Sequence, residues 1–169
     1  MKIVPWAVFL LSLTQALVAS AQDNSIEGFA LMGVKLDMTP EQATQVLKAE
    51  SNDVTDRTAS CRLAPTQQCR KILAMLPDGS IDVLFQHSQR GFRSVRVALT
   101  VKGRGESDRD TIVSAAIDHY GPPTLTDPAW CSLNALRRGC RDDAPAMVFR
   151  PLAGAAGEFI LRDASTGDP

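Results

Sequence analysis

Apolar and polar side chains alternate most regularly along residues 95–101. The apolar positions of this run are Val95, Val97, Leu99 and Val101, and the positions between them are Arg96, Ala98 and Thr100. A period of two is typical of a β-strand that buries one face and leaves the other in water. The run therefore predicts an antiparallel sheet with one wet face.

Other short apolar runs, bounded by turn residues, indicate further strands. They cover residues 59–64, 69–76, 81–86, 130–131, 147–149 and 159–161. The segment Pro77-Asp78-Gly79-Ser80 has the composition of a turn and separates two of these runs. Residues 26–36 alternate loosely and predict a leading strand or an extended segment.

Two segments have the features of amphipathic helices. In the first, Thr39 is a good N-cap, Pro40 fits the first helical position and Gln42 completes a capping box, so a helix is expected to end near Glu50. The second is expected to be capped by Ser107 or Asp108 and to stop at Gly121, which two prolines follow. Its apolar stripe comprises Ile112, Val113, Ala116, Ile117 and Tyr120.

Four cysteines form two close pairs, one after each predicted helix. Cys61 and Cys69 are eight residues apart, and Cys131 and Cys140 are nine residues apart. Because each helix is followed by strands and by a cysteine pair, the pattern predicts an α+β fold of two tandem units, each a helix packed on an antiparallel sheet. The predicted boundaries are a signal peptide at 1–21, a first unit at 22–102, a connector at 103–107, a second unit at 108–163 and a flexible tail at 164–169.

The first residues have the composition of a secretory signal. Lys2 is followed by an uncharged, largely apolar stretch, and Ala19-Ser20-Ala21 matches the small-x-small cleavage rule. Cleavage after Ala21 would place the mature chain in the periplasm or outside the cell. The alternative is an uncleaved anchor, although polar residues and Pro5 make the stretch a poor membrane span. No stable membrane insertion is expected after cleavage.

An oxidising compartment favours disulfides over free thiols. Four cysteines allow three connectivities, and local pairing is favoured because each interval fits a β-hairpin or a short loop; bridges between the two units are the alternative. A metal site is a poor fit, since no CxxC occurs and neither His87 nor His119 stands at ligand spacing to a cysteine. No cofactor is expected.

The charge of the mature chain is close to zero. All nineteen acidic residues and seventeen of the eighteen basic ones follow Ala21, which gives a net charge of about −2. Such a balance argues against nucleic acid as a bulk electrostatic partner.

The candidate binding residues lie near the second cysteine pair. Arg137, Arg138 and Arg141 cluster around Cys140 and could bind an anion or a protein partner, or form a solvated loop. Trp130, next to Cys131, is a further candidate for partner binding. No G-x-S-x-G nucleophile motif occurs, so no catalytic residue is predicted.

Two short segments resemble a known group of exported proteins. Residues 33–43, GVKLDMTPEQA, are similar to the G-x-x-x-GMT-x-x-x-V opening of small exported bacterial domains, with Asp37 where that motif has glycine. His119-Tyr120-Gly121-Pro122-Pro123, followed by Trp130, resembles a KYG-x-P…W pattern of uncharacterised exported proteins. The group includes the SmpA/OmlA-type outer-membrane assembly lipoproteins and the β-lactamase inhibitor proteins. The resemblance implies tandem helix-plus-sheet units, with a local disulfide in each unit as in the inhibitors.

Three functions remain open from the sequence. The favoured one is an exported, disulfide-stapled, non-enzymatic module that holds a protein of the cell envelope through its open sheet face or its disulfide loops. The second is an inhibitor of a secreted hydrolase such as a β-lactamase. The third is an enzyme with an unfamiliar site that uses Asp118 and His119.

Overall fold

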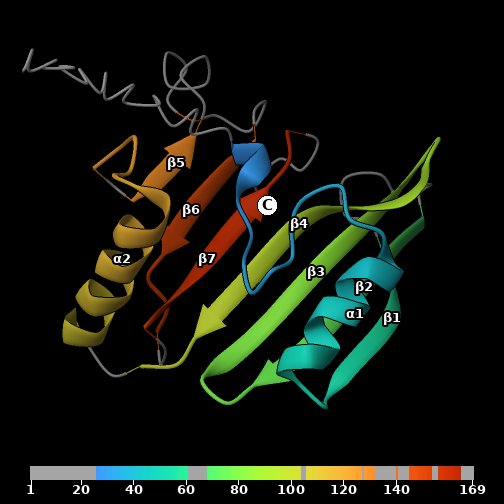
Figure 1. Ribbon diagram of the computed structural model, residues 1–169, viewed down its shortest axis with the longest axis horizontal. Coiled ribbons are helices and arrows are strands. Elements are labelled where there is room, and N and C mark those ends of the chain that lie inside the picture. The colour runs from blue at the N-terminus through green and yellow to red at the C-terminus, as the bar shows by residue number, and fades with distance from the viewer. Residues whose placement is uncertain are drawn as a thin grey trace, which may run out of the picture.

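The computed structural model describes residues 26–60, 68–103, 106–126, 128–131, 140, 145–153 and 156–164. The predicted signal peptide and Cys61 lie outside these residues, as does most of the predicted tail. Within the described part, seven strands form a single antiparallel sheet in the order β1-β2-β3-β4-β7-β6-β5 (Figure 1). The predicted α+β class is therefore confirmed.

The elements come in two runs, each a helix followed by a meander of strands. The first run is α1 (Pro40–Glu50), β1 (Val54–Ser60), β2 (Gln68–Leu76), β3 (Gly79–Ser88) and β4 (Gly91–Val101). The second run is α2 (Glu106–Tyr120), β5 (Ala129–Cys131), β6 (Ala146–Arg150) and β7 (Gly157–Arg162). β4 pairs with β7 from Arg96↔Arg162 to Val101↔Gly157, and this ladder joins the two meanders edge to edge.

One row of side chains crosses the sheet on the face that the helices cover. Its members are in register from strand to strand and none is more than 2% exposed; they are Ile72, Val83, Val97, Leu161, Met147 and Trp130. A single hydrophobic cluster contains this row and apolar residues of both helices. The two runs of elements thus share one core. Along β3, buried and half-buried positions alternate. In β4, from which the wet face is predicted, Val95, Val97 and the outward-pointing Ala98 are all buried, so burial does not follow a strict period of two there.

The helix boundaries follow local capping chemistry. The predicted capping box of α1 is present: Gln42 N–H donates to Thr39 Oγ1 at 3.3 Å, and Thr39 N–H donates to Gln42 Oε1 at 2.9 Å. The cap predicted for α2 at Ser107 or Asp108 is wrong, because the helix already begins at Glu106 and these residues lie in its first turn. An acidic side chain in the first turn, such as that of Asp108, interacts favourably with the positive end of the helix dipole. Gly121 ends α2 with φ +81, as expected.

Residues 26–36 do not form the predicted leading strand or extended segment. They form a 3₁₀ turn at Ile26–Gly28 and then a tight reversal in which Leu31 and Val34 exchange backbone hydrogen bonds of 3.0 and 2.9 Å. Met32 and Gly33, at the tip, have φ of +50 and +75, as a hairpin turn of this kind requires. Figure 1 shows this segment between α1 and α2, over the same face of the sheet. Its buried apolar residues complete the core there; they are Ile26, Phe29, Leu31 and Val34.

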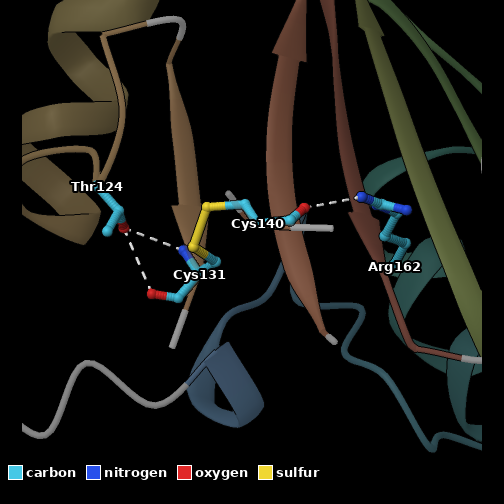
Figure 2. Close-up of a disulfide and its surroundings, with 4 residues drawn as sticks. All are labelled: Thr124, Cys131, Cys140 and Arg162. Atoms are coloured by element: carbon cyan, nitrogen blue, oxygen red, sulfur yellow. Dashed lines mark hydrogen bonds between the residues drawn. A yellow bond between two sulfur atoms is a disulfide. The ribbon is translucent and has the colours of Figure 1, made fainter. Parts of the chain in front are cut away.

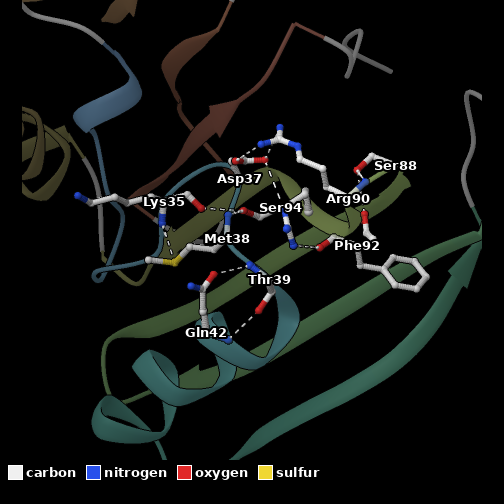
Figure 3. Close-up of polar contacts among 11 residues, drawn as sticks. Lys35, Asp37, Met38, Thr39, Gln42, Ser88, Arg90, Phe92 and Ser94 are labelled. Atoms are coloured by element: carbon white, nitrogen blue, oxygen red, sulfur yellow. Dashed lines mark hydrogen bonds and ion pairs between the residues drawn. The ribbon is translucent and has the colours of Figure 1, made fainter.

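Ser94 holds the end of this segment against β4 (Figure 3). Its hydroxyl donates to the Lys35 carbonyl at 2.7 Å and accepts from the Met38 N–H at 2.9 Å. Its backbone N–H donates to the Met38 carbonyl, and its carbonyl accepts from the Asp37 N–H, each at 2.9 Å. A β-bulge between β3 and β4 places Ser94 opposite Phe85, which departs from the unbroken alternation expected at Val95.

Tyr120 ties the start of the same segment to α2. Its hydroxyl donates to the Ala30 carbonyl, and its ring stacks on Phe29 with 4.6 Å between centroids. Burial raises the pKa of Tyr120 above its ordinary value of 10.0. Trp130 supports the same corner, since its indole Nε1–H donates to the Gly121 carbonyl at 2.8 Å.

We expect Ser94→Ala to lower the free energy of unfolding by about 1–3 kcal/mol, because the Lys35 carbonyl and the Met38 N–H would lose their buried partner. Urea denaturation followed by circular dichroism measures this. The matched control is Ser114→Ala on the exposed side of α2, which we expect to change stability by less than about 0.5 kcal/mol. Equal effects of the two substitutions would contradict the role given to Ser94.

We expect Tyr120→Phe to destabilise the protein by about 1 kcal/mol at neutral pH through loss of the bond to Ala30. The raised pKa means that the folded state favours the neutral phenol, so this contribution is complete below pH 10 and is lost as the pH rises further. Because Tyr120 is the single tyrosine of the chain, the stability difference between wild type and variant should stay constant up to about pH 10 and narrow above it. A constant difference would contradict the assignment.

Candidate binding surfaces

The face of the sheet that points away from the helices is called the outer face below. It is formed by the strand residues that alternate with the buried row. Cross-strand pairing places Lys71, Leu84 and Arg96 side by side on it, and Leu73, Asp82 and Ala98 in the next row. Met75, 46% exposed, lies beside Leu73 at the far end of β2.

Basic side chains dominate the outer face. They are Arg57, Lys71, Arg93, Arg96 and Arg150, whereas the acidic residues of its described strands are Asp82 and Glu158; Arg162 points to the same side but is only 5% exposed. Lys71 forms an ion pair with Asp82, and Arg96 Nη2 lies 4.0 Å from a carboxylate oxygen of Glu158. Arg93 Nε also lies 3.7 Å from a carboxylate oxygen of Asp37. Exposed ion pairs of this kind contribute little to stability. The five basic residues of the face that are not buried outnumber these three acidic residues, so the face keeps a small positive excess.

The helix side has the opposite sign. The two helices carry more acidic than basic residues, namely Glu41, Glu50, Glu106, Asp108, Asp110 and Asp118 against Lys48 and Arg109. Acidic residues thus predominate on the helices and basic residues at the outward strand positions, a segregation that the near-zero net charge does not reveal.

The disulfide between Cys131 and Cys140 lies on the outer face beside β5 (Figure 2). It spans nine residues, so the predicted local pairing is confirmed for this pair. Arg162, on β7, donates through Nη2 to the Cys140 carbonyl at 3.3 Å. Thr124 Oγ1 accepts from the Cys131 N–H at 3.1 Å. Cys69 is disulfide-bonded as well, and it is buried on the same side of the sheet.

Of the other predicted binding residues, the structure describes Trp130 but not the three arginines near Cys140. Arg137, Arg138 and Arg141 lie outside the described residues, so their role stays a prediction. Trp130 does not belong to an exposed surface: it is 2% exposed and packs in the core against Tyr120 and Phe159. Its position on the helix-facing side of β5 follows from strand alternation, since its neighbour Cys131 faces outward.

Asp118 and His119 are exposed at the end of α2, where neighbouring positions on a helix do not face each other. The His119 ring packs edge-on against Tyr120, with centroids 4.6 Å apart. Among the described residues, no group of histidine, cysteine, aspartate and glutamate side chains is arranged to hold a metal ion.

An ion-pair cluster lines a shallow hollow of about 470 Å³ at the edge of α1. Arg70 Nε lies 3.0 Å from each carboxylate oxygen of Asp56, and Arg70 Nη1 lies 3.4 Å from Glu41 Oε1. These contacts, led by the bond to Asp56, raise the pKa of Arg70 further above its ordinary value. Arg70, Asp56 and Glu41 therefore satisfy one another.

A larger cavity of about 590 Å³ lies between α2 and the β6 side of the sheet. Most of its wall is apolar, and its polar side chains come from α2; it is lined by Arg109, Asp110, Val113, Ser114, Ile117, Pro128, Phe149 and Pro151. Arg109 Nε is buried there without a hydrogen-bond acceptor. The apolar stripe predicted for α2 includes Val113 and Ile117, but the sequence does not reveal that α2 leaves a gap over Phe149.

No helix in the described part of the chain is long and apolar enough to cross a membrane. No protein-family model matches the chain, and no curated protein or solved structure matches it either.

Proposed function

We propose that the protein is an exported, non-enzymatic binding module of the cell envelope, and that its outer face binds an acidic protein partner. The observation that carries the proposal is the excess of basic side chains on the outer face. A positive patch steers a negatively charged partner toward it and fixes its orientation. The Cys131–Cys140 disulfide is consistent with an oxidising compartment.

The chemistry of the outer face favours a folded protein over other anionic partners. Aliphatic side chains lie among the charges, as in protein interfaces; Leu73, Met75 and Leu84 are the largest that are half-buried or exposed. The described strand residues of this face include no aromatic side chain on which bases could stack or which could enter a lipid interface. A mixed aliphatic and basic sheet face therefore fits an acidic protein surface best.

The repeat organisation belongs to the same proposal. Each run of elements is a helix followed by an antiparallel meander, and the two meet at β4 and β7. Two such units, related by duplication, would present one broad sheet face to a partner. The alternative function, inhibition of a secreted hydrolase, stays a prediction that an assay against purified β-lactamases tests directly.

The test uses the double variant Arg57→Gln/Lys71→Gln, which removes two charges of the outer face. Immobilised protein should retain an acidic partner from native periplasm at low salt and release it as the salt concentration rises past about 0.2 M. The double variant should retain at least about tenfold less, because two long-range attractions are lost. Quantitative mass spectrometry of the retained proteins measures the difference.

The matched control is Lys35→Gln/Lys48→Gln, which removes the same charge from exposed positions on the helix side. We expect it to retain the partner as the wild type does. Equal losses in the two variants, or a retained partner that is basic, would contradict the proposal. Retention of the protein itself, checked by gel filtration at low salt, would instead indicate self-association between faces of opposite charge and would also overturn it.

A further inference from the structure

We propose that the cavity between α2 and β6 binds the anion of a fatty acid, with the carboxylate on Arg109 and the hydrocarbon chain along the apolar wall. This site is separate from the outer face and does not depend on the function proposed for it. The cavity opens on the helix side of the sheet, and its volume of about 590 Å³ lies within the range of small-ligand sites.

The apolar wall of the cavity is formed by α2, by β6 and by two prolines. Val113 and Ile117 extend from one face of α2, Phe149 forms the β6 side, and two prolines contribute the remaining wall. Val113 and Ile117 are only partly buried, although they pack against the core. Apolar surface in a cavity is stabilised when a hydrocarbon chain displaces water from it.

The polar end of the cavity lies in the first turn of α2. Arg109 Nε is buried and has no hydrogen-bond acceptor, and no hydrogen bond or ion pair joins Arg109 to another residue in the described part of the chain. A guanidinium in this state lacks the carboxylate partner that its planar donors fit best. The helix dipole adds attraction for an anion at the same end. Asp110 also lines the cavity, and no ion pair joins it to Arg109.

The backbone of the wall distinguishes a fatty acid from a peptide that ends in a free carboxylate. Pro128 and Pro151 have no N–H, and the Phe149 N–H already donates to the Pro128 carbonyl at 2.9 Å. The α2 residues of the wall use their backbone groups within the helix. A peptide would bury its own amides without partners here, which is unfavourable. A fatty acid has one polar group, and Arg109 meets it.

The experiment is a calorimetric titration of the purified protein with dodecanoate below its micelle concentration. We expect saturable binding of one equivalent. Arg109→Gln should weaken it about tenfold or more, since a charge-assisted contact is lost. Dodecanol, with the same chain and no carboxylate, should bind wild type about as weakly as dodecanoate binds the variant. Lys48→Gln, which removes a positive charge from an exposed position on α1, is the control and should bind as wild type does.

A second variant tests the location of the chain. Ser114→Trp places a large ring at the exposed wall of the cavity and should abolish binding while the circular dichroism spectrum and the thermal unfolding midpoint stay unchanged. Methyl resonances of Val113 and Ile117 should shift on addition of dodecanoate. Equal binding by wild type and Arg109→Gln, unshifted methyl resonances, or tighter binding of a leucine-ended hexapeptide than of dodecanoate would each overturn the proposal. Loss of partner retention by Arg57→Gln/Lys71→Gln with normal dodecanoate binding would separate this site from the outer face.

Discussion

The ladder between β4 and β7 is the interaction on which the rest of the architecture depends. It runs from Arg96↔Arg162 to Val101↔Gly157 and joins a four-stranded meander to a three-stranded one. Either meander alone would bury only a small core and would expose a long edge strand. Joined, they present one continuous row of buried side chains to two helices. Both helices cover the same face and leave the outer face of β1–β4 uncovered, whereas at the β5–β6 end outward-pointing residues such as Cys131 and Ala146 are buried in a second apolar cluster.

The segment 29–38 occupies the space that this arrangement leaves between the helices. Tyr120 binds its start through the Ala30 carbonyl, and Ser94 binds its end through Lys35 and Met38. Asp37 adopts φ +63, a left-handed conformation that glycine accommodates best, and glycine is what the resembling motif has at this position. Ion pairs with Arg90 at 3.3 Å and Arg93 at 3.7 Å accompany the strained aspartate. The segment thus covers the sheet between the two helices. The cavity described above lies between α2 and β6.

Features set by neighbours in sequence could be predicted, and features set by distant contacts could not. The capping box of α1, the glycine stop of α2 and the alternation of β4 are local, so the sequence is sufficient to identify them. The bulge that turns Ser94 toward Lys35 depends on pairing with β3 and on a segment more than fifty residues away. The buried position of Trp130 follows from the register of β5 on β6, which no local pattern states. The basic residues of the outer face were visible one by one in the alternation, but their gathering on one surface depends on the strand order.

That gathering matters because distance limits how far opposite charges cancel. Layers of secondary structure pack about 10 Å apart, and the screening length at physiological salt is about 8 Å. The acidic groups on α1 and α2 therefore lie more than one screening length behind the outer face. A partner approaching that face encounters Arg57 together with the Lys71–Asp82 and Arg96–Glu158 pairs, and little of the helix side. Net charge describes such a protein poorly. Its electrostatics are those of two faces, and which one a ligand meets is decided by the sheet that separates them.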